Sequence, residues 1–196
     1  HRMACINVDS FVLQLLLQRH LDWSDQPVAV VSEDKPPGTV VAVNQPALAA
    51  GVREGMRYTA ALSLVECLQA DTVSSEEVTA GVRLVIDRLL SISPSVEGSE
   101  PETGDNANAY AKSGVFWMDA SGLRRHHRSP AALAQTIQRC LSAEQFKSTV
   151  VIGYTRFGTY LLARDTPQGC LVVPGAANER RAARKTPIER LPLKPA

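Results

Sequence analysis

The 196-residue chain is 44% hydrophobic and 21% charged, and its formal net charge is +1. Such a chain can bury a sizeable core, and its near-neutral charge excludes the overall basic excess of many nucleic-acid-binding proteins, so any contact with nucleic acid must be local. It holds no apolar run near the roughly 20 residues that cross a bilayer and shows no export leader, so we expect a cytoplasmic protein with no membrane contact.

The cysteines and histidines give no sign of a metal site. The cysteines are far apart, form no CxxC pair and have no histidine at metal-ligand spacing. We therefore expect reduced, mostly buried thiols at Cys5, Cys67, Cys140 and Cys170. The sequence also lacks a Ser-His-Asp order, a P-loop and the glycine pattern of a dinucleotide-binding fold, so hydrolase and NTPase functions have no support.

The chain begins with an apolar strand at 4–8 that leads into a helix at 11–19. Asp9 and Ser10 occupy the turn between them, where either side chain is suited to cap the helix. An acid at the carboxyl end of a first strand is also where many α/β enzymes hold a metal ion or a phosphate group. A simple capping role needs one acceptor only, whereas catalysis needs further partners.

Strands and helices alternate along the rest of the chain. Apolar runs predict strands at 27–32, 39–43, 114–119, 149–154 and 170–173, the first two as a hairpin. Spacing and capping signals predict helices at 45–50, 58–68, 75–90, 130–145 and 156–164. The polar segment 95–113 is predicted to be a mobile loop. This order suits a ferredoxin-like layer with a small inserted lobe.

Six short motifs follow one another along the chain. They are IxVDSF at 6–11, AAGVREGM at 49–56, SPSVE at 93–97, WMD at 117–119, VIGYT at 151–155 and PIERLP at 187–192. In this order they resemble the palm and fingers of a Y-family translesion DNA polymerase, and more narrowly the catalytically inactive ImuB branch. The last motif normally opens the thumb, so the resemblance implies a chain truncated there.

The resemblance implies a mixed α/β (α+β) fold, with a ferredoxin-like polymerase palm and a small inserted fingers lobe. The palm would comprise 3–12 and 72–169, the fingers 13–71, and the start of the thumb 170–196.

Active members of this family hold two divalent cations with carboxylates, which activate the primer hydroxyl and neutralise the triphosphate. In this chain the carboxylate positions correspond to Asn7, Gly114 and Val115, and Asp9 is the residual acid. The resemblance therefore implies no catalytic residue and no bound metal. A shifted alignment would place Glu100 or Glu102 near the site, although both lie in the polar segment.

The positions that grip the triphosphate in active members are also changed. A tyrosine, an arginine and a lysine correspond to Gln45, Leu48 and Gly158, with Arg156 close by as a candidate substitute. Losing two phosphate contacts together with three carboxylates removes more than the roughly 10²- to 10³-fold that one electrostatic group supplies. We expect a pseudo-polymerase that needs no cofactor.

Basic residues form local clusters that are candidates for contact with DNA or a partner. They are Arg124, Arg125, Arg128, Arg156, Arg180, Arg181 and Arg184. A solvated surface is the ordinary alternative for each cluster.

The resemblance implies a scaffold or accessory factor in bacterial SOS-induced translesion synthesis and mutagenesis. Its implied partners are an ImuA-type RecA-like protein, an error-prone C-family DNA polymerase, and the sliding clamp through a segment outside this chain. Contact with DNA would be weak. Two alternatives stay open: an active translesion polymerase with a rearranged metal site, and a ferredoxin-like module unrelated to DNA.

Overall fold

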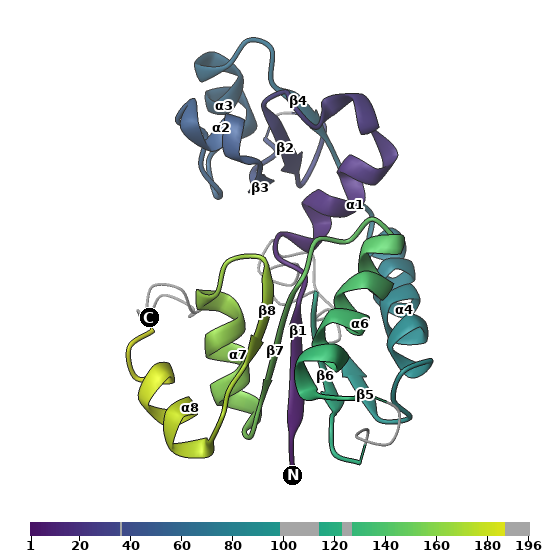
Figure 1. Ribbon diagram of the computed structural model, residues 1–196. Coiled ribbons are helices and arrows are strands. Elements are labelled where there is room, and N and C mark those ends of the chain that lie inside the picture. Colours follow the sequence, from purple (N-terminus) through teal and green to yellow (C-terminus); the bar gives the residue numbers. More distant parts are fainter. Residues whose placement is uncertain (36, 99–113, 123–126, 187–196) are drawn as a thin grey trace. The chain divides into compact units, whose positions relative to one another are not determined.

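A computed structural model describes residues 1–35, 37–98, 114–122 and 127–186 (Figure 1). Its contacts divide the chain into two compact units, each described here by itself. The described part of the first unit comprises 1–9, 82–98, 114–122 and 127–186, and that of the second comprises 10–35 and 37–81.

The first unit is built on a five-stranded sheet in the order β5-β6-β1-β7-β8. Its strands are β1 (Met3–Asn7), β5 (Val96–Gly98), β6 (Val115–Asp119), β7 (Thr149–Gly153) and β8 (Gly169–Val172). The central strand β1 pairs antiparallel with both β6 and β7, and β8 runs parallel to β7. Ala4, Cys5 and Ile6 are fully buried, because β1 is covered on both faces.

Helices cover both faces of this sheet. They are α4 (Ser75–Leu90), which belongs to this unit from Val82, α6 (Pro130–Ala143) and α7 (Arg156–Asp165). A further helix, α8 (Ala176–Ala183), packs on α7. Figure 1 shows α7 on one side of the sheet, α4 and α6 on the other, and α8 against the outer side of α7. Leu162 and Ala163 of α7 pack with Cys5, Val115 and Val151 in one apolar cluster.

The second unit has a three-stranded sheet in the order β3-β2-β4. Its strands are β2 (Val28–Val31), β3 (Val40–Val43) and β4 (Gln69–Asp71). Its helices are α1 (Phe11–Arg19), a 3₁₀ turn at Leu21–Trp23, α2 (Gln45–Ala49) and α3 (Tyr58–Leu64). A cluster that includes Ala29, Val40, Ala47 and Val52 forms its core.

Most of the predicted elements are confirmed. The hairpin is the antiparallel pair β2 and β3, and the first helix has the predicted bounds of α1. Two short strands, β4 and β5, were not predicted, and β5 corrects the expectation of a loop throughout 95–113, whose remainder from 99 lies outside the described residues. The predicted cap by the Ser10 side chain is also wrong: Ser10 is the N-cap residue, but its φ of 48° is left-handed and its side chain makes no capping bond.

The capping box at the start of α4 is confirmed. The Ser74 N–H donates to Glu77 Oε2 at 2.8 Å, and the Glu77 N–H donates to Ser74 Oγ at 3.2 Å. Glu77 also receives Arg19 Nη1 at 2.7 Å. The hydrogen bond from the Ser74 backbone is the main reason why the pKa of Glu77 lies below its usual value, with Arg19 contributing.

The four cysteines are free thiols, but only Cys5 is buried, so the expectation of mostly buried thiols is wrong. Burial raises the pKa of the Cys5 thiol, against a smaller opposing effect of Arg156.

Among the described residues, no helix is both long enough and apolar enough to cross a membrane. The predicted cytoplasmic location stays a prediction. So do the predicted palm, fingers and thumb boundaries, and residues 170–186 belong to the first unit.

Candidate functional site

Asn7, Gly114 and Val115 meet at one end of the sheet in the first unit. Asn7 is the last residue of β1 and lies opposite Val115 on β6 and Thr149 on β7. The Val8 N–H donates to the carbonyl oxygen of Gly114 at 2.8 Å. The structure thus brings together the three positions at which the resemblance implies metal-binding carboxylates.

The side chains of Asn7 and Val115 are buried. Asn7 and Val115 are each 4% exposed, and Val115 belongs to the cluster that α7 covers. Because side chains alternate along a strand, Asn7 shares its face of the sheet with Cys5. An amide and a valine at this face offer no anion.

Asp9 supplies the residual carboxylate just beyond β1. Its side chain is 75% exposed, and Arg164 Nη1 lies 3.5 Å from its Oδ1. Arg164 lies in the last turn of α7, the helix that follows β7. Sequence reasoning missed Arg164, although a basic residue in the last turn of a helix is a recognisable signal.

These residues do not fit a pair of divalent cations. Magnesium requires hard oxygen ligands at near-ideal octahedral geometry, and carboxylates normally anchor it. Among Asn7, Gly114, Val115 and Asp9, only Asp9 carries a carboxylate, and a guanidinium already faces it. Across the described ranges, no cluster of three or more His, Cys, Asp or Glu residues can hold a metal. Glu100 and Glu102 lie outside the described residues.

Gln45 and Leu48 lie on α2, in the second unit, and both side chains are exposed. Neither offers a positive charge to a phosphate. Arg53, which follows α2, donates from Nη1 to the carbonyl oxygens of Leu48 and Val52 at 2.6 and 2.9 Å.

Gly158 and Arg156 do not share a site with Asn7. The register of β7 places Gly153 opposite Met3 and Thr149 opposite Asn7, so α7 begins at the far end of the sheet from Asn7. Four residues of strand separate the two ends by about 13 Å.

Arg156 already has partners in the first unit. It forms an ion pair with Glu97 of β5, and its guanidinium lies 4.2 Å from the centre of the Trp117 ring. Its charge is therefore partly neutralised before any ligand arrives.

The start of α7 holds a buried carboxylate instead. Glu179 of α8 is 1% exposed, and its Oε1 accepts from the N–H of Thr155 at 3.0 Å and from the Thr155 hydroxyl. Its Oε2 accepts from the Tyr154 N–H. A Cβ atom at Gly153 or Gly158 would overlap this carboxylate. Sequence reasoning missed Glu179, because only the packing of α8 on α7 brings it here.

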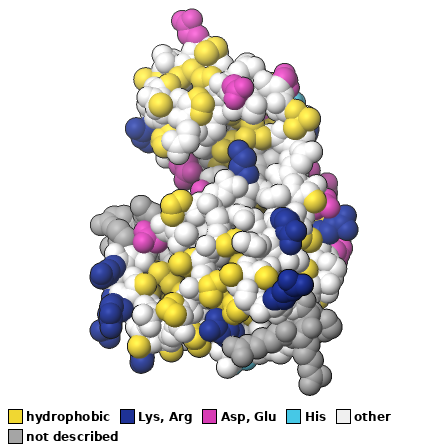
Figure 2. Space-filling model, viewed as in Figure 1, with side chains coloured by type: hydrophobic (Ala, Val, Ile, Leu, Met, Phe, Trp, Pro, Cys, Tyr) yellow, Lys and Arg dark blue, Asp and Glu magenta, His cyan; other side chains and the backbone are white. Residues whose placement is uncertain are grey.

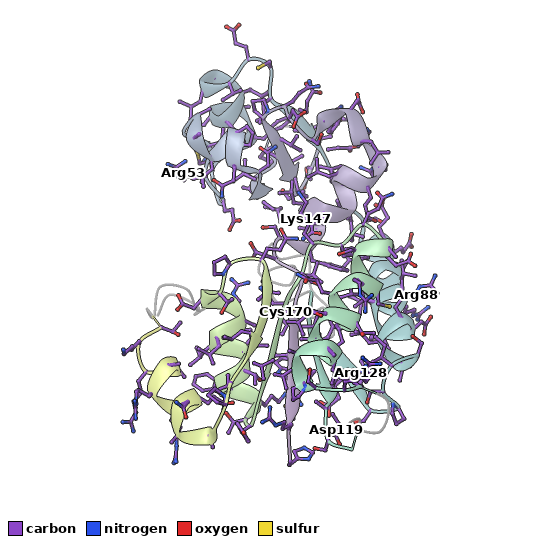
Figure 3. The ribbon with its side chains drawn as sticks, viewed as in Figure 1. Arg53, Arg88, Asp119, Arg128, Lys147 and Cys170 are labelled. Carbon is purple, nitrogen blue, oxygen red and sulfur yellow. The ribbon has the colours of Figure 1, made fainter. Side chains whose placement is uncertain are left out.

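The remaining candidate contacts are basic residues on the surface. Arg180, Arg181 and Arg184 are exposed on and just after α8, and Figure 2 shows Lys and Arg side chains gathered at the lower left, where Figure 1 draws this helix. Arg128 is exposed, and Figure 3 shows it toward the same end of the first unit as Asp119, with Lys147 toward the other end. Arg124 and Arg125 lie outside the described residues.

The family model of the impB/mucB/samB family matches residues 6–163 of the chain. Among solved structures, DinB from Sulfolobus solfataricus is 16% identical with a TM-score of 0.71, over 90% of this chain and 49% of that one. The insertion ternary complex of Dbh DNA polymerase is 16% identical with a TM-score of 0.77, over 98% of this chain and 54% of that one.

The chain therefore spans about half the length of these structures. No curated protein matches it. The match over 6–163 and the shared fold lead to one conclusion: the chain belongs to the impB/mucB/samB family and has the fold of a Y-family DNA polymerase.

Proposed function

We propose that the chain is a noncatalytic Y-family homologue of the ImuB branch, which acts as a scaffold or accessory factor in bacterial SOS-induced translesion synthesis. The observation that carries this proposal is the end of β1. Asn7 and Val115 lie side by side there, both buried, where cations would need carboxylates.

The chemistry supports this conclusion. Phosphoryl transfer depends almost entirely on positioning and on neutralising charge, so a site without its anions loses both metal ions and their effect on the nucleophile. The fold does not depend on those ions, because the cores of both units are apolar. A protein that only binds partners can keep this fold after the reaction is lost.

The proposed partners follow from the same branch. They are an ImuA-type RecA-like protein, an error-prone C-family DNA polymerase, and the sliding clamp through a segment outside this chain. The proposed location is cytoplasmic, and no cofactor is proposed.

An active translesion polymerase with a rearranged metal site is the second candidate. Its support is Asp9, which keeps an exposed carboxylate beside the degenerate positions. In that case a further acid, such as Glu100 or Glu102, would have to complete the site.

Primer extension distinguishes the two candidates. The 196-residue chain is mixed with primed DNA, nucleotides and Mg²⁺ or Mn²⁺, with Dbh DNA polymerase as the active control. We expect no extension beyond the background of a protein-free reaction. Extension by the wild-type chain that Asp9→Ala or Glu102→Ala abolishes would establish the active candidate and overturn the proposal.

The scaffold role needs its own test. Purified ImuA-type protein and C-family polymerase are passed over the immobilised chain, with an active Y-family polymerase immobilised in a parallel channel. Selective capture by this chain is expected. Equal capture in both channels, or none, would contradict the scaffold role.

A further inference from the structure

Helix α8 is attached to its unit through a charged residue. Glu179 is the buried residue of this eight-residue helix, and its carboxylate is bonded just before α7, at Tyr154 and at the N-cap residue Thr155. A buried carboxylate persists only where strong donors replace its hydration, and these backbone N–H groups provide them. Glu179 therefore fixes which side of α8 faces inward.

The helical repeat then decides what faces outward. At about 100° per residue, Arg180, Arg184 and Arg181 lie at about 100°, 140° and 200° around the axis from Glu179. Lys185, just beyond the helix, continues the same arc. The orientation of α8 that buries Glu179 therefore turns these four cations toward solvent, and all four are exposed.

These cations differ from three arginines of the first unit that have an acidic partner. Arg88, Arg156 and Arg164 each form an ion pair with an acid. Arg180, Arg181, Arg184 and Lys185 form none with any residue that the structure describes. With Ala177 they line an open hollow of about 490 Å³ that has no acidic side chain in its lining.

A structural role explains part of this arrangement. Cations in the last turn of a helix interact favourably with its dipole, which accounts for Arg180 and Arg181. It does not require four cations around one hollow, where they repel one another. A polyanion would relieve that repulsion, and the lining has no aromatic side chain on which a base could stack.

We propose that this α8 surface, formed by Arg180, Arg181, Arg184 and Lys185, binds the phosphodiester backbone of DNA without sequence preference, and that Glu179 is its positioning residue. The inference rests on the proposed function, because a scaffold for translesion synthesis works on DNA. It assigns the phosphate contacts to one helix face, away from the Asn7 end of the sheet.

The test is a salt titration of the 196-residue chain with a fluorescent primed duplex, without nucleotide or divalent metal, read by anisotropy. Each phosphate contact contributes about 0.9 to the slope of log K against log salt. The variant Arg180→Gln/Arg181→Gln/Arg184→Gln should lower this slope by about 2 or more. The matched variant Arg57→Gln/Arg83→Gln/Arg139→Gln removes the same charge from other exposed positions and should leave it nearly unchanged.

Two results of the titration would overturn the proposal: no binding by the wild-type chain at low salt, or an equal loss of slope in the matched variant. Equally tight binding of polyglutamate would also overturn it, because an acidic protein segment would then be the ligand. Glu179→Gln keeps all four cations and should still lower the slope, because α8 loses its attachment. The proposed function is tested by primer extension and by partner capture, whereas this titration measures DNA binding alone. Failure of the DNA-binding proposal is therefore distinguishable from failure of the proposed function.

Discussion

Asn7 and Val115 are direct neighbours across the antiparallel strands β1 and β6, and each side chain is 4% exposed. Residues that face one another on adjacent strands are close enough for their side chains to touch. A single carboxylate introduced at this pair would be buried without the cations that stabilise it in an active polymerase.

Asn7→Asp should therefore lower the free energy of unfolding by about 1–3 kcal/mol at pH 7.5. Burial would hold the new carboxyl's pKa above its unfolded value of about 4, so its penalty appears as pH rises and fades in acid. Urea unfolding at pH 4 and pH 7.5 measures this. Asn178→Asp is the exposed control. A loss that is equal at both pH values, or that Mg²⁺ reverses, would contradict the buried, isolated environment assigned to Asn7.

Glu179→Ala should reduce the free energy of unfolding by about 2–5 kcal/mol, because the N–H groups of Tyr154 and Thr155 would lose their acceptor. Hydrogen exchange should also accelerate across Ala176–Ala183. Glu66→Ala changes an exposed acid and should shift stability by about 0.5 kcal/mol or less. Unchanged exchange in α8 would show that other contacts hold this helix.

Gly158→Ala should destabilise the protein, although alanine is the better helix former by about 1 kcal/mol. The added methyl group would overlap the Glu179 carboxylate. In the Glu179→Ala background that overlap disappears and the close approach to Thr155 Oγ1 remains, so the same change should cost less. A double-mutant cycle by chemical denaturation measures this coupling. Additive effects would show that the carboxylate does not limit the space at Gly158.

The capping box at Glu77 should make stability depend on pH. The folded-state pKa of Glu77 is held below its ordinary value of 4.5, so the stabilisation is present above 4.5 and is lost as pH falls through the lower folded value. Thermal unfolding of wild-type and Glu77→Gln chains between pH 3 and 6 measures it. The wild-type advantage should shrink with acid. An advantage that grows in acid would contradict the assignment.

Much of the fold could be predicted from the sequence, because its long elements have strong local signals. The pattern of α4 includes a capping box, and the apolar runs at β2 and β7 clearly predict buried strands. The missed strands are three residues each: Gln69–Asp71 has no apolar pair, and Val96–Gly98 lies in a polar segment. Pairing with neighbours, not local preference, makes them strands.

The candidate site was predictable only in part. Motif order grouped Asn7 with Val115 correctly in space, because both positions are tied to adjacent strands. Motif order could not show that Gly158 follows the end of β7 that lies away from Asn7, since the direction of β7 is a property of the sheet. Glu179 could not be found from local pattern, because its donors lie 24 and 25 residues earlier in the chain.

The central place of β1 has a consequence for biosynthesis. Both neighbours of this strand, β6 and β7, emerge from the ribosome more than 100 residues after it, whereas the described part of the second unit is a nearly uninterrupted stretch from 10 to 81. The nascent polypeptide can thus fold its second unit first, before the strands that pair with Met3–Asn7 have been synthesised. Such delayed pairing slows folding and exposes a strand to aggregation, so this segment is where chaperones would be needed during translation.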